Sequence, residues 1–258
     1  MQPLYLDAGQ HARVELDGPS LLVRTGNAAA RRFPFSRLTR VVVCGPLEME
    51  ITALVECLRR GLAVTFLAAD GTPAGAALPA RPRQSRFEER LEELLERHDW
   101  RALYENWRRA AERRQIVGAL RRLRLRSQDL RPASAAGAID QELTCRLSPE
   151  RRREAIPWLE GLLTALVSER LSELGVSPQV LADRRPGFQL VSDLTALLLW
   201  ALKAELGVSM AAQAMPAPLT PRQWRRRLVS WFEERRGQEL SRAARLLDGF
   251  SYWLGGIR

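Results

Sequence analysis

The hydrophobic pattern changes its period near residue 80, and this change restricts the architectures that the chain can adopt. Before this point, apolar residues form short strand-like runs: LYLDA (4–8), ARVELDGPSLLVRTG (12–26) and LTRVVVCG (38–45). After it, apolar residues recur every three or four positions over long stretches. A period of two fits a half-buried strand, and a period of 3.6 fits an amphipathic helix. The sequence therefore predicts an α+β fold, with strands first and helices afterwards.

Turn residues divide the first part into a small β-rich domain, which we assign to residues 1–79. The Asp-Gly pair in VELDGPSLLV lies between two apolar runs and predicts a β-hairpin. The segment MEITALVECLRRG (49–61) has helical apolar spacing and ends in Gly61, which is typical of a helix C-terminal cap. A buried strand, LAVTFL, follows.

A segment rich in proline and arginine marks the boundary, and we assign residues 80–86 to a linker. Residues 87–258 form a larger all-α domain in this interpretation. Thr220 and Pro221 have the residue types of a helix cap and first helical position, and Gly237 is expected to separate the last two helices. The expected helices span residues 86–98, 100–125, 151–175 (with Pro157 starting or kinking the helix), 192–207, 220–237 and 238–256.

The charge of the chain indicates the kind of partner it binds. The net charge is +10, and Lys203 is the only lysine among the 40 basic residues; all others are arginines. A basic surface of this size attracts polyanions, nucleic acid first. Two explanations of the preference for arginine over lysine are equally good: phosphate binding by the planar guanidinium group, and a GC-rich genome that encodes arginine wherever a cation will serve. The second does not explain the excess of positive over negative charge. The three cysteines form no CxxC pair, no apolar stretch is long enough to span a membrane, and no secretory signal is recognisable, so a reducing cytoplasm is expected.

The order of motifs resembles a known family. Three segments follow its pattern: residues 19–78, the stretch WLEGLLTALVSERLSELGVSPQV (158–180) and the stretch PGFQLVSDLTALLLW (186–200). The chain resembles the CRISPR-associated integrase of spacer acquisition (the Cas-one family) over most of residues 4–210. The resemblance implies an integrase-like two-domain architecture in a prokaryotic cytoplasm and pairing of subunits through the β-domain.

Active members of that family hold a divalent metal ion with a glutamate, a histidine and an aspartate. The family pattern LRGxEGxAA matches LRPASAAGA (130–138) and places Ser134 on the glutamate. The histidine position falls on Arg184 in an ungapped match and on Ala182 in a gapped one. Residues 99–258 contain no histidine, so only Asp193 keeps a ligand type. One carboxylate cannot build a Mg²⁺ site, so no metal is expected, and Mg²⁺ or Mn²⁺ is implied only if the site has moved.

Other residues remain open to two interpretations. Asp193 follows Ser192, a candidate N-cap, and its charge would favour the helix dipole. Asp140 and Glu142 could replace the lost glutamate or simply face solvent. Tyr104, Trp107, Trp224, Trp231, Phe232 and Trp253 could stack on bases, but at helical spacing such residues are more often core.

The arginines of two segments are the candidate contacts to the DNA backbone, and solubility is the alternative explanation for them. The first segment contributes eight candidates and the second three: Arg108, Arg109, Arg113, Arg114, Arg121, Arg122, Arg124 and Arg126, then Arg225, Arg226 and Arg227.

Three functional hypotheses follow. The first is a catalytically inactive integrase-like subunit that binds double-stranded DNA (prespacer or repeat) and assembles as a homodimer or with an active integrase paralogue and a small ferredoxin-like adaptation protein. The second is an active metal-dependent nuclease or integrase with a relocated site. The third is a stand-alone DNA-binding regulator. The sequence favours the first, in which the chain is not an enzyme.

Overall fold

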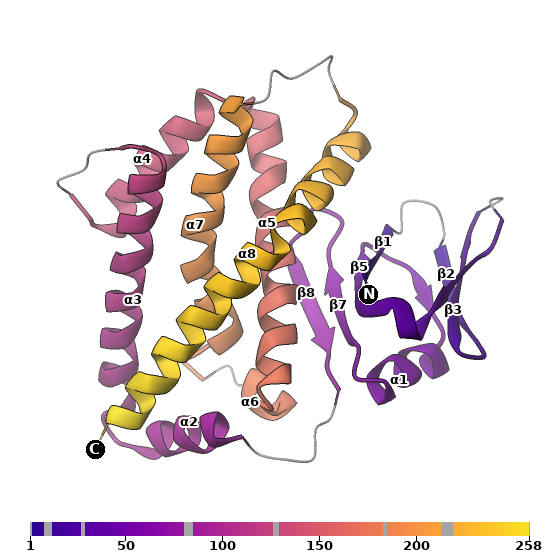
Figure 1. Cartoon of the computed structure of the whole chain (residues 1–258), viewed down its shortest axis with the longest axis horizontal. Coiled ribbons are helices and arrows are strands. Elements are labelled where there is room, and N and C mark those ends of the chain that lie inside the picture. The colour runs from indigo at the N-terminus through magenta and orange to yellow at the C-terminus, as the bar shows by residue number, and fades with distance from the viewer. Residues whose placement is uncertain are drawn as a thin grey trace. The chain divides into compact units, whose positions relative to one another are not determined.

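The computed structural model describes residues 2–7, 12–26, 29–79, 85–125, 129–182, 185–212 and 219–257. The chain divides into two compact units (Figure 1). Residues 1–89 and 164–182 form the first unit, and residues 90–163 and 183–258 form the second. The expected order, strands first and helices afterwards, is confirmed. Residues 164–182, which sequence order places among the later helices, belong to the first unit with the strands.

Two four-stranded sheets form the strand-rich part of the first unit. In the first sheet, β5 pairs in parallel with both β1 and β7, and β8 is antiparallel to β7. In the second sheet, β2 and β3 form an antiparallel hairpin, with β4 and β6 at the edges. The bounds are β1 Gln2–Asp7, β2 Ala12–Asp17, β3 Ser20–Thr25, β4 Arg31–Pro34, β5 Leu38–Cys44, β6 Glu48–Met49, β7 Ala63–Leu67 and β8 Pro73–Ala77, with a 3₁₀ turn at Phe35–Arg37 and helix α1 at Ile51–Arg59.

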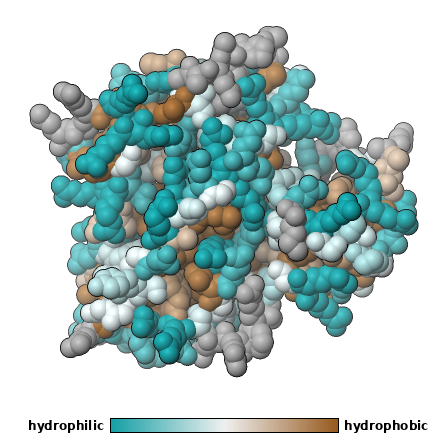
Figure 2. All heavy atoms as spheres, in the orientation of Figure 1, coloured by the Kyte–Doolittle hydropathy of each residue, from teal (hydrophilic) through white to brown (hydrophobic). Residues whose placement is uncertain are grey.

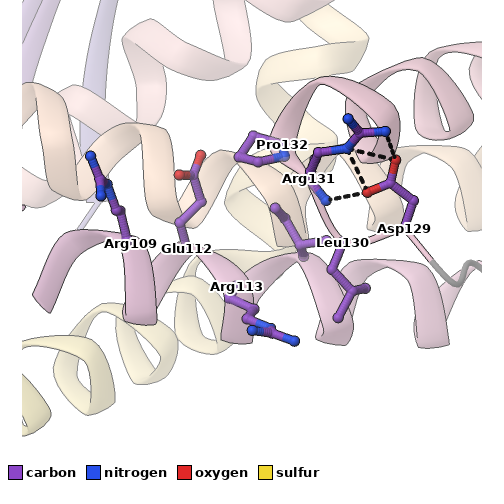
Figure 3. A pocket seen from close by; sticks show the side chains of 8 residues that line it. Arg109, Glu112, Arg113, Asp129, Leu130, Arg131 and Pro132 are labelled. Atoms are coloured by element: carbon purple, nitrogen blue, oxygen red, sulfur yellow. Dashed lines mark hydrogen bonds and ion pairs between the residues drawn. The ribbon is translucent and has the colours of Figure 1, made fainter. Parts of the chain in front are cut away.

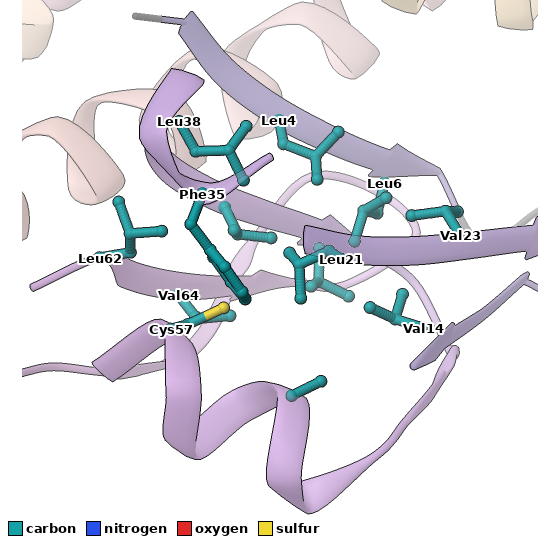
Figure 4. Packing of buried hydrophobic residues seen from close by; sticks show 13 residues of the cluster. Leu4, Leu6, Val14, Leu21, Val23, Phe35, Leu38, Cys57, Leu62 and Val64 are labelled. Atoms are coloured by element: carbon teal, nitrogen blue, oxygen red, sulfur yellow. The ribbon is translucent and has the colours of Figure 1, made fainter. Parts of the chain in front are cut away.

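The expected turns of this unit are present. The β2–β3 hairpin closes between the paired residues Asp17 and Ser20, and Gly18 adopts a φ of 55°, a backbone conformation that suits glycine. Gly61, with a φ of 76°, follows the end of α1. Leucine and valine side chains from both sheets pack around Phe35 and against Cys57 of α1 (Figure 4). Burial raises the pKa of the Cys57 thiol to about 11, so this cysteine stays protonated in the core.

A buried arginine in β5 ties the sheet to a helix of the same unit. Arg40 is 1 % exposed, and its guanidinium donates hydrogen bonds to Glu169 Oε2 (2.9 Å) and to the Tyr5 hydroxyl (3.1 Å). Glu169 lies in the second half of helix α5 (Pro149–Glu173), in the part that clusters with the strands. The ion pair therefore joins this part of α5 to the strands of the first unit.

Helices build the second unit. Helix α3 packs against α7, and α4 packs against both. Aromatic rings fill the space between α3 and α8: the ring centroids of Trp107 and Phe250 lie 4.1 Å apart. Besides α1 and α5, the described helices are α2 Arg86–Glu96, α3 Trp100–Arg122, α4 Pro132–Thr144, α6 Pro178–Ala182, α7 Leu190–Ala212 and α8 Pro221–Gly256.

Two expectations about helix ends are wrong, and one is confirmed. Gly237 does not end a helix: α8 continues through it to Gly256, because Glu239 and Ala243 continue the buried face. Helix α7 begins at Leu190, so Ser192 lies within its first turn and is not the N-cap. Thr220 caps α8 as expected, in a capping box with Gln223 and with Pro221 at the first helical position. Pro157 lies inside α5.

Polar side chains dominate the face of the molecule drawn in Figure 2. Large apolar side chains are exposed at only three of the described positions, Ile51, Val55 and Tyr252. Within the described helices, none is both long and apolar enough to cross a membrane.

Candidate nucleic-acid interface

The arginines of α3 fall into two groups, because some are held by acids and others are not. Arg109 forms an ion pair with Glu105, one turn earlier on the same helix. Arg122 donates to both carboxylate oxygens of Glu205 on α7, at 3.0 Å each, and Glu205 is only 4 % exposed. Arg242 of α8 donates to the same carboxylate at 2.7 Å. Arg122 is therefore part of a network that joins three helices, and it is poorly placed to serve a phosphate.

Arg113, Arg114 and Arg121 form the second group. Each is exposed, and none has an acidic partner within the described part of the chain. At 100° per residue, these three arginines lie on one side of α3 together with Ala110, and residues 113 and 121 are about 12 Å apart along the axis. We call these three residues the α3 arginine face. A guanidinium with no internal partner is available for a phosphate oxygen, so this face is the part of α3 best suited to bind a nucleic-acid backbone.

The remaining arginines of this segment occupy other environments. Arg108 is half-buried near the Tyr104 ring system. Arg124 follows the end of α3 with a φ of 57°, and its N–H and that of Leu125 donate to the carbonyls of Arg121 and Leu120. This is a Schellman cap in which arginine takes the place that glycine usually fills. Arg126 lies outside the described residues.

A pocket of about 360 Å³ opens between α3 and the start of α4 (Figure 3). Its polar lining combines three arginines with two acids, and its apolar lining comes from Ile116, Leu130 and Pro132. In Figure 3, Arg109 and Glu112 stand on one side of α3, and dashed lines join Arg131 to Asp129. The polar residues that line the pocket are Arg109, Arg113, Arg131, Glu112 and Asp129. The pocket continues the positive surface of α3 towards α4.

Ser134, the residue at the family's glutamate position, has a structural partner. Its hydroxyl donates to Asp129 Oδ2 at 2.6 Å, and the same carboxylate accepts the Arg131 N–H at 2.9 Å. The guanidinium of Arg131, followed by the Ser134 hydroxyl, holds the pKa of Asp129 far below its usual range. Asp129 is therefore an anion that organises the start of α4, and Ser134 supplies no carboxylate for a metal ion.

Asp193 is also engaged. Its Oδ2 accepts the Tyr104 hydroxyl at 2.9 Å and the Gln189 N–H at 3.1 Å, just before α7 begins. Burial of Tyr104, reinforced by the negative charge of Asp193, raises the pKa of the phenol well above its usual range, so the hydroxyl remains a donor. The carboxylate satisfies a free N–H at the helix start, which allows α7 to begin ahead of Ser192.

These contacts do not fit the divalent metal ion that the family implies. Within the described ranges, no group of three or more histidine, cysteine, aspartate or glutamate side chains could hold a metal ion. Arg184 and the Ala182 side chain lie outside the part of the chain that the structure describes. Glu142 pairs with Arg146, and Asp140 is exposed. The described donors near Asp193 are a phenol and a backbone amide, which are suited to a carboxylate and not to a cation.

The second predicted patch contains one exposed and two half-buried arginines. Arg226 is exposed, whereas Arg225 and Arg227 are half-buried. Arg225 Nε lies 2.5 Å from Glu154 Oε1 of α5. The structure adds Arg151 of α5, which lies over the Trp224 ring and which sequence reasoning did not select. The run RRR at 151–153 was the available signal.

Most aromatic candidates for base stacking belong to the core. The Tyr104, Trp107, Trp224, Trp231 and Phe232 side chains are each at most 5 % exposed. Only Trp253 is half-buried. Base stacking by the first five would require the helices to separate.

Solved structures define the class of this fold. A CAS1 protein from Thermotoga maritima superposes with a TM-score of 0.77 at 16 % identity, over 100 % of this chain and 98 % of that one. A casposase bound to integration product gives a TM-score of 0.63 at 16 % identity, over 94 % and 82 % of the two chains. A chain of a Cas6-RT-Cas1–Cas2 complex gives 0.60 at 13 % identity, over 96 % of this chain and 35 % of that one.

The two-part fold is thus that of CAS1 proteins. Residues 4–165 match the family model described as CRISPR associated protein Cas1. This match covers more than half of the chain, which therefore belongs to the Cas1 family, as the sequence motifs indicated. A comparison with curated protein sequences gives no match.

Proposed function

We propose that this chain is a non-catalytic Cas1-family subunit that binds DNA in CRISPR adaptation. The observation that carries the proposal is the state of Asp193, whose carboxylate is held by Tyr104 and Gln189. The two other ligand positions suggested by the resemblance fall on Ser134 and on Arg184 or Ala182, and Ser134 is hydrogen-bonded to Asp129. No step through a metal ion is derived from these residues.

DNA binding is supported by the α3 arginine face and by the net charge of +10. Guanidinium groups without internal partners release counterions when they contact phosphates, and this favours binding without base selectivity. We therefore expect the chain to bind double-stranded prespacer or repeat DNA with little sequence preference and with a steep dependence on salt.

Assembly with other adaptation proteins forms the second part of the proposal. The relatives of this fold include a chain in a complex with Cas2 and a casposase bound to its integration product. By analogy, the chain pairs with itself or with an active integrase paralogue, and it joins a small ferredoxin-like companion protein in the cytoplasm of a prokaryote. In a mixed complex, the active subunit would catalyse while this subunit holds DNA.

A turnover assay tests the absence of catalysis. The purified chain is incubated with duplex DNA and a repeat-containing plasmid in Mg²⁺ or Mn²⁺, beside a Cas1 protein that keeps all three ligands as a positive control. We expect neither cleavage nor integration. Product formation that disappears in Asp193→Ala would overturn the proposal and would favour a relocated active site.

A co-expression experiment tests assembly. The full chain is produced with an intact integrase paralogue, and the mixture is analysed by size-exclusion chromatography with light scattering. A mixed complex is expected, with or without DNA and the companion protein. Separate elution under all these conditions would favour a stand-alone DNA-binding protein.

A further inference from the structure

The N-terminal parts of α5 and α8 meet through reciprocal contacts between arginine and tryptophan. The Arg151 guanidinium carbon lies 5.5 Å from the centroid of the Trp224 ring, and that of Arg225 lies 5.9 Å from the Trp158 ring. Arg225 also forms the ion pair with Glu154. Both tryptophans are buried. These contacts hold the two helix starts together within the second unit and fix the direction of two guanidinium groups.

Further arginines border this contact. On α8, Arg222, Arg225 and Arg226 are spaced i, i+3 and i+4, so they share one side of the helix. On α5, Arg153 has a side chain 75 % exposed, and its nearest acid is Glu150 at 3.8 Å, itself 73 % exposed. An ion pair this open to water contributes little and leaves the guanidinium free to exchange partners. We call Arg151, Arg153, Arg225 and Arg226 the α5/α8 surface.

Hydrogen-bond donors outnumber acceptors on this surface. The guanidinium groups of Arg151, Arg153, Arg225 and Arg226 are set against the carboxylates of Glu150 and Glu154. Arg226 is exposed and has no acidic partner in the described part of the chain. A ligand that brings several anionic oxygens would correct this imbalance.

An anionic partner of this surface could be DNA or an acidic segment of a protein, and the lack of exposed apolar side chains discriminates between them. A protein interface has an apolar centre within a polar rim. An interface with DNA is polar throughout and strongly positive on the protein side. None of the exposed large apolar residues found among the described positions lies in residues 149–160 or 219–230. This distribution favours phosphates over the acidic segment of a protein.

We propose that the α5/α8 surface is a second contact for the phosphodiester backbone of DNA, separate from the α3 arginine face. The proposal rests on DNA binding as the function of the chain, and it adds a site that includes Arg151 and Arg153. Arg151 is already held in place by the Trp224 ring, so little side-chain freedom is lost when a phosphate binds it. Arg153 and Arg226 supply further donors at the exposed edge.

The test removes the two most exposed charges, Arg153→Gln with Arg226→Gln, in the full chain. A matched control, Arg24→Gln with Arg32→Gln, removes two exposed arginines from the β2–β4 strands and lowers the net charge equally. Binding to a fluorescent duplex is measured between 50 and 300 mM salt, and thermal melts establish that each variant is folded. The slope of log K against log salt should fall by about 1.8 in the test variant, because each lost phosphate contact removes about 0.9. The control should keep the slope of the wild type.

The outcomes separate this proposal from the proposed function. An unchanged slope in the test variant, with a reduced slope on substitution of the α3 arginine face, overturns the α5/α8 contact and leaves DNA binding intact. Unchanged slopes for both sets overturn DNA binding through these surfaces altogether. An unchanged slope combined with loss of the mixed complex with the paralogue or companion protein would assign the surface to a protein partner and would also refute the proposal.

Discussion

Replacing the α3 arginine face should weaken the salt dependence of DNA binding by a predictable amount. The triple variant Arg113→Gln, Arg114→Gln and Arg121→Gln removes three exposed guanidinium groups that have no acidic partner within the described chain. Each phosphate contact contributes about 0.9 to the slope of log K against log salt, so the slope should fall by about 2.7 if all three bind phosphates. When salt is raised from 50 to 200 mM, the affinity of both proteins falls. The fold-decrease should be about 40 times smaller for the variant than for the wild type.

A triple control separates local contacts from overall charge. Arg13→Gln, Arg24→Gln and Arg32→Gln lower the net charge by the same three units, but these side chains are exposed on strands β2, β3 and β4 and already pair with Glu15 or Asp17. Fluorescence anisotropy with one duplex across a salt series measures both slopes, and urea unfolding shows that both variants are folded. If test and control change the slope equally, the arginines act only through net charge, and the argument from ion-pair partners is refuted.

Four further predictions concern stability. Arg124→Gly should raise the free energy of unfolding in urea by about 1 kcal/mol, whereas Arg124→Ala should not, because only glycine relieves the positive φ. Glu169→Gln should destabilise the chain by about 3 kcal/mol, since it removes the carboxylate that lies 2.9 Å from the buried Arg40 guanidinium; a loss below about 1 kcal/mol would show that the pair is dispensable. Burial raises the pKa of Glu239, so the folded chain retains a proton that the unfolded chain has lost, and stability from this group falls as pH rises above the ordinary glutamate value. Glu239→Gln should remove that fall in melts from pH 4 to 8. For Glu205, burial raises the pKa, but the Arg242 and Arg122 guanidinium groups outweigh this effect and lower the pKa overall. Glu205→Gln should therefore cost stability at pH values above the ordinary pKa of glutamate. Identical pH profiles for the Glu239 and Glu205 variants would contradict this assignment.

Local sequence determined the secondary structure and several of its boundaries. The alternation of apolar residues in β2 and β3 and the positive φ required at Gly18 act over a few residues, so the hairpin could be predicted. The capping box at Thr220 is equally local, because its hydrogen bonds join residues three apart. The family motifs are also a property of the linear sequence, and the match of residues 4–165 to the family model confirmed the family that they indicated.

The tertiary structure decided what the individual arginines do. Arg122 and Arg121 are neighbours in the sequence, yet Arg122 binds Glu205 from α7 while Arg121 is exposed without an acidic partner in the described chain. Which of them meets an acid depends on where α7 packs, and composition cannot supply that. For the same reason, the sequence could name Asp193 as the last ligand candidate but could not show that Tyr104 occupies its carboxylate from 89 residues away. The DNA-binding role of the arginines stays a prediction.

Helix ends also depend partly on local sequence and partly on tertiary packing. Gly237 has the residue type that ends a helix, but α8 continues because its buried face extends on both sides, through Phe232 and Glu239. Sequence order places the second half of α5 among the later helices, but it clusters with the strands, where Glu169 meets Arg40 across 129 positions of sequence. Periodicity and caps act within a few residues and can be read from the chain itself. Ion pairs and packing between distant residues exist only after folding, and they determine which charges remain free to bind DNA.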